Sequence, residues 1–231
     1  MMQTSLQNPS TQQHQQPIVV QAADPVPPPP PLPPKFPRQD LINGQNREYL
    51  KTGIRLYEAS IQCDWEAAKN ILLKKPELVR FSITENAETA LHIAASAKGP
   101  KYVEQFVKNL VGMMTRADLE IVNKNHNTAL YLAAAAGNLE TVKIMVKLNR
   151  KLLIIPGAKG TMMPLYAAAL FGNNEVVKYL YQESKNLSED GWTDTNRRLL
   201  LQKCVESDMF GKHFSICIFH LQMLVEKVSC R

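Results

Sequence analysis

The alternation of apolar and polar positions in residues 126–146, HNTALYLAAAAGNLETVKIMV, predicts two short helices joined by a tight turn. Alanine has the highest helix propensity and the smallest side chain, so the run Ala133–Ala136 predicts a helix that another backbone can approach closely. The Gly-Asn pair at 137–138 ends that helix. Apolar residues then recur at helical intervals, at Leu139, Val142 and Val146. Because one such pair cannot bury its own apolar face, we expect further copies.

Copies of this unit do recur along the chain. The aligned leucines of the first helices are Leu56, Leu91, Leu130, Leu165 and, in a degraded copy, Leu200, at intervals of 35, 39, 35 and 35 residues. A helix–turn–helix unit with this period predicts a solenoid, in which each unit completes the core of its neighbours. We assign the four extra residues of the long interval to the loop VGMMTR, residues 111–116, and expect it to be the weakest joint.

The repeated pattern T-A-L-H-x-A-A, followed by a short turn and a V-V-x-x-L second helix, resembles the ankyrin repeat. The matching residues are Thr89, Leu91, His92, Ala94 and Ala95 in one copy, Thr128, Leu130, Tyr131, Ala133, Ala134 and Gly137 in the next, and Pro164, Leu165, Tyr166, Ala168, Ala169, Gly172, Val176, Val177 and Leu180 in the third. The resemblance implies an all-α solenoid with four ankyrin-like repeats in residues 41–185. A degraded fifth repeat and a C-terminal helix are expected in residues 186–231.

A narrower resemblance extends into the segment GWTDTNRRLLLQKCVESDMF. With it, the repeats are similar to plant ankyrin proteins that end in a PGG-type membrane domain, and the sequence departs from that family at Gly211. The apolar stretch FSICIFHLQMLV is interrupted by Ser215, His220 and Gln222 and is shorter than the ~20 residues that span a bilayer. We therefore expect no stable membrane span and a cytoplasmic protein, or one held at the inner face of a membrane by a partner.

Residues 1–40 have a different composition from the repeats. They are rich in glutamine up to residue 23 and continue as DPVPPPPPLPPKFPR, residues 24–38. The segment has too few apolar side chains to fold, so we expect a disordered tail with a stiff polyproline II stretch. Such a stretch is either a spacer or a ligand for an SH3- or WW-type domain, with Lys35 and Arg38 supplying flanking charge.

The charge pattern argues against nucleic-acid binding. The net charge is +6, and the whole excess lies in residues 41–185, where 19 basic side chains face 13 acidic ones. No basic run exceeds two residues, whereas a nucleic-acid interface needs a concentrated stripe. A diffuse excess fits an acidic protein partner or an anionic membrane surface equally well.

The residue types needed for catalysis or metal binding do not converge in the sequence. The candidates for a zinc site have irregular gaps and lack the close pairs of zinc modules: Cys204, His213, Cys217 and His220. No Gly-rich phosphate loop is present. We therefore expect no enzyme activity, no catalytic residue, no metal and no cofactor.

The ankyrin resemblance implies a binding groove lined by the ends of the first helices and by the tips of the turns. The helix-end positions are Ile61, Gln62, Ser96, Ala97, Ala135, Ala136, Leu170 and Phe171. The tip positions are Glu85, Glu88, Lys124, Asn127, Lys159 and Met162. Because a few large anchors dominate protein interfaces, Leu170 and Phe171 matter most. They either form an apolar wall beside Ala135 and Ala136 or pack against the fifth copy.

Two hypotheses of function follow. The first is a non-enzymatic protein–protein interaction module, an ankyrin scaffold or adaptor in plant signalling or the stress response. The alternative is the truncated cytosolic part of a membrane-anchored ankyrin signalling protein.

Overall fold

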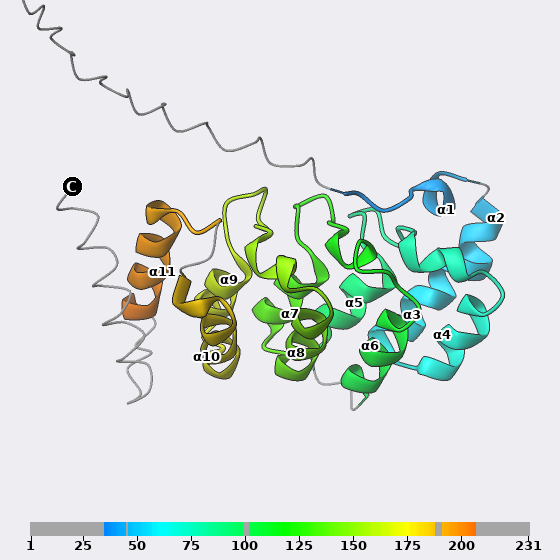
Figure 1. The fold of residues 1–231 in the computed structure, drawn as a ribbon. Helices are drawn as coiled ribbons and strands as arrows, with labels where there is room; N and C mark the ends of the chain where they lie inside the picture. Colours follow the sequence, from blue (N-terminus) through cyan, green and yellow to red (C-terminus); the bar gives the residue numbers. More distant parts are fainter. Residues whose placement is uncertain (1–34, 45, 99–101, 188–190, 207–231) are drawn as a thin grey trace, which may run out of the picture. The chain divides into compact units, whose positions relative to one another are not determined.

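Four helix pairs form the body of the protein in the computed structural model (Figure 1). The first helices are α3 (Ile54–Gln62), α5 (Ala90–Ser96), α7 (Ala129–Ala136) and α9 (Pro164–Leu170). The second helices are α4 (Trp65–Leu72), α6 (Val103–Val111), α8 (Leu139–Leu148) and α10 (Asn174–Glu183). The described residues contain no strand, only isolated bridges between single residues. The predicted all-α repeat fold is confirmed.

The structure describes residues 35–206, apart from 45, 99–101 and 188–190. The predicted disordered tail therefore falls outside the described residues up to residue 34, and so does the predicted C-terminal helix in residues 207–231. Within the described part, the degraded fifth copy contributes one helix, α11 (Asp194–Glu206), which contacts α9.

Short elements complete the chain. Before the first pair come α1 (Asp40–Asn43), α2 (Asn46–Glu48) and a π-helical turn, η1 (Tyr49–Gly53). Each second helix is followed by a 3₁₀ turn; these turns are η2 (Pro76–Arg80), η3 (Asp118–Glu120), η4 (Arg150–Ile154) and η5 (Lys185–Leu187).

The core is built from the leucines and alanines of the repeat pattern. All five aligned leucines are at most 2% exposed. Ala94, Ala134 and Ala168 are fully buried, and the first helices contact one another in series from α3 to α11. Small side chains let these backbones approach, so each first helix is buried by the first helices of neighbouring repeats as well as by its own second helix.

The four extra residues of the long interval do not lie at VGMMTR. The connection between α5 and α6 spans residues 97–102, whereas the equivalent connections span 63–64, 137–138 and 171–173. The segment from the start of α6 to the start of α7 has the same length as in the first and third repeats to within one residue. The insertion is therefore in the turn inside the second repeat, and its assignment to residues 111–116 was wrong.

The N-terminal boundary also differs from the sequence prediction. Lys35 forms a parallel bridge with Ile121, and Arg38 forms one with Phe81. Residues 35–38, which the sequence assigned to the disordered tail, are thus held in extended form against the repeats. This contact could not be predicted from the sequence, because the bridges join residues far apart in the chain.

Candidate functional site

The tips of the second and third repeats are joined through His92. Its Nε2 lies 3.1 Å from the carbonyl oxygen of Asn127, and its Nδ1 lies 3.3 Å from the backbone nitrogen and 2.8 Å from the Oγ1 of Thr89. Because Nε2 faces a carbonyl, it carries the proton, and Nδ1 accepts. Burial lowers the pKa of His92 to about 4. The residue is a neutral structural link between the two repeats.

Two asparagines connect neighbouring repeats at the C-terminal ends of the first helices. Asn138 Nδ2 donates to the carbonyl oxygens of Ala95 and Ala97, at 2.8 and 2.9 Å. Asn173 Nδ2 donates in the same way to Ala134 and Ala135, at 2.8 and 3.0 Å. The last carbonyls of a helix lack the N–H donors of a following turn. Each asparagine therefore caps the first helix of the preceding repeat, a role that the sequence analysis missed although Asn follows Gly in both copies.

The predicted helix-end positions all lie at the C-terminal ends of first helices. Phe171 and Ile61 are 59% and 43% exposed. Leu170 is half-buried, so its side chain contributes to packing as well as to the surface. The others divide into exposed residues, Gln62 and Ser96, and half-buried ones, Ala97, Ala135 and Ala136. The Asn173 cap holds the turn that contains Phe171 against the end of α7, where Ala135 and Ala136 lie.

The predicted tip positions separate into two groups. Glu88 accepts hydrogen bonds from Thr84 and Asn86 in its own loop. Asn127 Oδ1 accepts from the backbone of Ala158, and Met162 Sδ lies 3.9 Å from the Tyr131 hydroxyl. These three residues hold the loops together. The remaining three side chains are exposed, and they are Glu85, Lys124 and Lys159.

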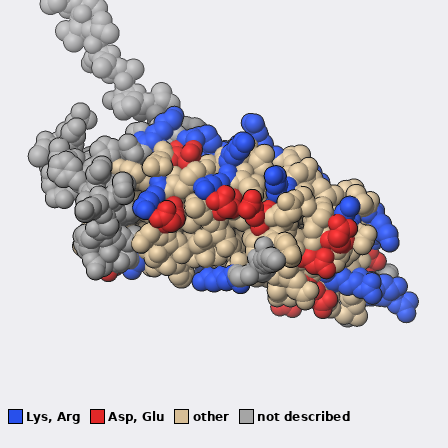
Figure 2. All heavy atoms as spheres, turned by 90° about the horizontal axis from the view of Figure 1, so that it is seen from below, with Lys and Arg blue, Asp and Glu red and all other residues tan. Residues whose placement is uncertain are grey.

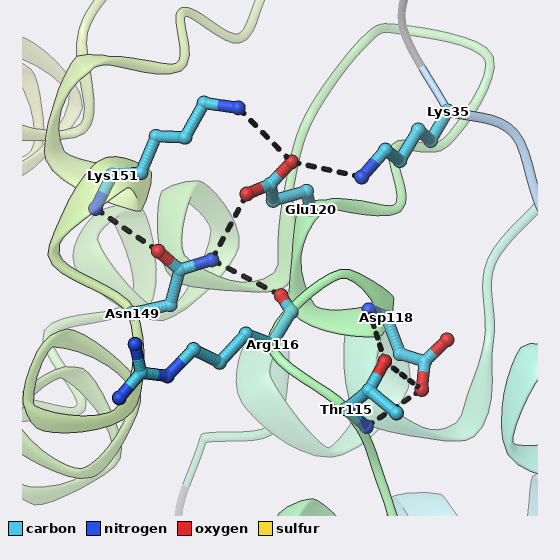
Figure 3. A network of polar contacts seen from close by, with 7 residues as sticks. All are labelled: Lys35, Thr115, Arg116, Asp118, Glu120, Asn149 and Lys151. Carbon is cyan, nitrogen blue, oxygen red and sulfur yellow. Dashed lines mark hydrogen bonds and ion pairs between the residues drawn. The ribbon is translucent and has the colours of Figure 1, made fainter.

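Two carboxylates of η3 cross-link the repeats and the N-terminal segment. Asp118 binds Arg80 of the preceding repeat. Glu120 binds Asn149 and Lys151 of the following one (Figure 3). Glu120 also pairs with Lys35, Oε2 to Nζ at 3.0 Å. Burial would raise the pKa of Glu120, but its hydrogen bonds and the two lysines outweigh burial and lower it. Neither carboxylate is marked by a local sequence signal, because both contacts join residues far apart in the chain.

The surface carries both signs of charge. Figure 2 shows Lys and Arg interspersed with Asp and Glu on the face that it draws, rather than one continuous basic stripe. A groove of about 490 Å³ on the first repeat is lined by the same mixture, with Lys51, Arg55, Lys74 and Lys75 beside Glu58 and Asp64. A polar outer face of this kind suits the terminal unit of a solenoid.

The candidates for metal binding and for a nucleophile can be placed only in part. Among them, no group of three or more His, Cys, Asp or Glu side chains could hold a metal ion. Of the sequence candidates for zinc, His213, Cys217 and His220 lie outside the described residues. Burial raises the pKa of the Cys63 thiol to about 11, so it is not an activated nucleophile. Within residues 35–206, where described, no helix is long and apolar enough to cross a membrane.

Comparison with known proteins bears on the repeats. A family model for ankyrin repeats in three copies matches residues 56–152. The interferon antagonist OPG040 of vaccinia virus (strain Western Reserve) is 31% identical over 102 residues, 44% of this chain and 33% of that protein. The interferon antagonist OPG039 of monkeypox virus is 31% identical over 96 residues, 42% and 31% of the two chains.

A plant protein is similar as well. The ankyrin repeat-containing protein ITN1 of Arabidopsis thaliana is 27% identical over 131 residues, 50% of this chain and 22% of that protein. The chain thus spans a third or less of the length of these relatives. Ankyrin repeats are protein–protein interaction modules, and the helix pairs, the buried alanines and the matched residues agree. Residues 56–152 of this chain are therefore ankyrin repeats.

Proposed function

We propose that the chain is a non-enzymatic scaffold that binds a partner protein on the exposed ends of its first helices. The observation that supports this most is the setting of Phe171. Phe171 is 59% exposed at the end of α9, on a turn that Asn173 holds against α7. Exposed aromatic side chains on rigid supports are effective anchors, because little conformational entropy is lost when they bind.

The alanines beside this turn supply the rest of the surface. Ala135 and Ala136 are half-buried and present no long side chain. A partner side chain therefore has room between Phe171 and the α7 end, with Leu170 as an apolar base. Ile61 and Ser96 extend the same row toward the first repeat.

A role as an adaptor in plant signalling is the finer part of the proposal. It rests on the similarity to the Arabidopsis protein and on the combination of a repeat surface with a proline-rich N-terminal segment. The viral relatives are named for interferon antagonism, which is said of those proteins alone. A repeat scaffold does not by itself set the partner, so the exposed residues must set it.

The test uses the full chain as bait in plant extract, with quantitative mass spectrometry of what is retained. We expect Leu170→Glu with Phe171→Asp to abolish retention of the specific partner while the circular dichroism spectrum stays unchanged. The matched control is Leu73→Glu, the same kind of change at a 66% exposed leucine at the end of the second helix α4. Equal loss in both variants, or no loss in either, contradicts the proposed surface.

A further inference from the structure

The N-terminal strap, residues 35–38, is bound to the repeats as a peptide ligand would be. Arg38 donates its N–H to the carbonyl oxygen of Arg80 at 3.0 Å and accepts from the N–H of Ser82 at 2.8 Å. Three residues earlier, the carbonyl oxygen of Lys35 accepts from the N–H of Val122 at 2.8 Å. Figure 1 draws the strap along the edge of the stack that the loops form. An extended chain that adds to exposed backbone groups in this way is a recurring mode of peptide recognition.

The register is three strap residues for each repeat. Phe81 and Ile121, the partners of Arg38 and Lys35, each follow a 3₁₀ turn directly and have extended backbone angles. Three extended or polyproline residues rise by about 9–10 Å, which matches the spacing of about 8–10 Å between packed helices. The edge therefore offers one backbone binding position per repeat.

The third repeat marks where this edge ends. Ile155 follows η4 and is also extended, but the next residue is Pro156, which has no N–H. Ser82 and Val122 supply the equivalent donor in the first two repeats. The edge thus has two complete positions in the first three repeats, and the strap fills both.

Side chains give each position a chemical preference. Lys35 Nζ lies 3.0 Å from Glu120 Oε2, which belongs to the network in Figure 3. The guanidinium of Arg38 lies 4.6 Å from the centre of the Phe81 ring. Between them Pro37 is buried, and Phe36 packs edge-on against His126 at 5.7 Å. The edge therefore favours a peptide with a basic residue, an aromatic residue, a proline and a second basic residue in that order.

The contacts of the strap are those of an exchangeable ligand. The side chains of Lys35 and Arg38 are 50% and 61% exposed. Exposed ion pairs contribute about 1 kcal/mol or less. The strap is favoured over a separate peptide chiefly because it belongs to the same chain, which gives it an effective concentration on the order of mM.

We propose that this edge is a second binding site, for an extended basic peptide of a partner protein with cations three residues apart and a proline before the second. The strap is its intramolecular occupant, and a partner segment of the same chemistry replaces it. The site is separate from the surface around Phe171, so it stands or falls independently of the function proposed above.

The experiment measures binding of a fluorescein-labelled peptide of residues 33–39, PPKFPRQ, by anisotropy at low salt. The receptor is the full chain with Lys35→Ser and Arg38→Ser, which weakens its own strap. We expect saturable binding at least about tenfold tighter than to the unaltered chain, whose strap competes. Adding Glu120→Gln to the receptor weakens binding by between about threefold and tenfold.

Controls separate sequence recognition from general attraction. The peptide PPSFPSQ is expected not to bind, and the Leu170→Glu, Phe171→Asp variant in the same background is expected to bind PPKFPRQ unchanged. Hydrogen exchange at the amides of Ser82 and Val122 rises in the receptor and falls again with peptide. If PPSFPSQ binds equally, or if a receptor with an unaltered circular dichroism spectrum binds neither peptide, the proposal is overturned.

Discussion

Arg80 and Asp118 form a two-point ion pair across the joint between the first and second repeats, with Nε to Oδ1 at 2.7 Å and Nη2 to Oδ2 at 3.0 Å. The Asp118 side chain is 9% exposed. Burial would raise its pKa, but the hydrogen bonds from Arg80 and Thr115 outweigh burial and hold the pKa below its ordinary value. The pair therefore joins two repeats and favours the charged form of the Asp118 carboxylate.

We predict that Asp118→Asn lowers the free energy of unfolding at pH 7 by about 1–3 kcal/mol, since it leaves Arg80 without its charge partner. Urea unfolding followed by circular dichroism measures it. Because the folded pKa is lowered, this contribution is fully present above the ordinary pKa of about 4 and is lost as the pH falls below it. Glu140→Gln is the control: its carboxylate is 54% exposed, so the change should stay within about 0.5 kcal/mol.

The helix pairs were predictable from sequence because their signals are local. Leu130 and the alanines that follow it predict a first helix from neighbouring residues alone. Gly137 and Asn138, directly after them, predict where that helix ends. The long interval was harder, since a spacing gives only the number of extra residues. The Gly-Pro pair at 99–100 was a turn signal inside the second repeat that would have located the insertion correctly.

The contacts between distant segments were not predictable in the same way. Lys35 and Glu120 are 85 residues apart, and their pairing exists only once the repeats have stacked. Lys35 reads in the sequence as flanking charge for a proline ligand, and only the fold shows that Glu120 already binds it. Likewise, the sequence pattern at Leu170 fits a core residue and a surface residue equally well. In the structure Leu170 is half-buried, so it contributes to packing and to the surface.

Acid should destabilise the protein through His92. Its folded pKa of about 4 lies below its ordinary value of 6.5, so the unfolded chain takes up the proton first. Stability is then fully present above about pH 6.5 and falls on the order of 1 kcal/mol per pH unit down to about pH 4. Chemical denaturation across this range should show the slope, and His92→Tyr, the residue type of the later copies, should remove it. His126→Asn should retain it; an unchanged slope in His92→Tyr would contradict the assignment.

The asparagine caps make a prediction about coupling. Asn173→Ala removes two hydrogen bonds to α7 and should cost about 1–2 kcal/mol of unfolding free energy. Gly137→Ala should cost about 1–3 kcal/mol, because Gly137 has φ of 84° and a Cβ there would lie 2.6 Å from Asn173 Oδ1. The double variant should lose less than the sum, since both act on one contact. Asn174→Ala, at the exposed neighbour, is the control, and full additivity would argue against a shared contact.

Limited proteolysis should locate the least protected connection of the stack. Thr115 N and Oγ1 bind Asp118 Oδ2 at 2.7 and 2.8 Å, and the carbonyl oxygen of Arg116 accepts from Asn149 at 3.0 Å. Lys98 is exposed in the connection that carries the insertion. Because a protease needs a backbone that opens locally, trypsin should cut after Lys98 at least about tenfold faster than after Arg116.

Mass spectrometry of the early fragments distinguishes the two cleavage sites. Lys98→Gln should remove the fragment that begins at residue 99 and leave the rate of cleavage at Arg116 unchanged. Asp118→Asn should raise the rate of cleavage after Arg116, because it releases Thr115 and with it the loop of residues 111–116. The rate of cleavage after Lys98 should stay unchanged. If Arg116 is cut first in the unaltered chain, the Asp118 and Asn149 contacts do not hold that loop, and the joint between the second and third repeats is the weak one after all.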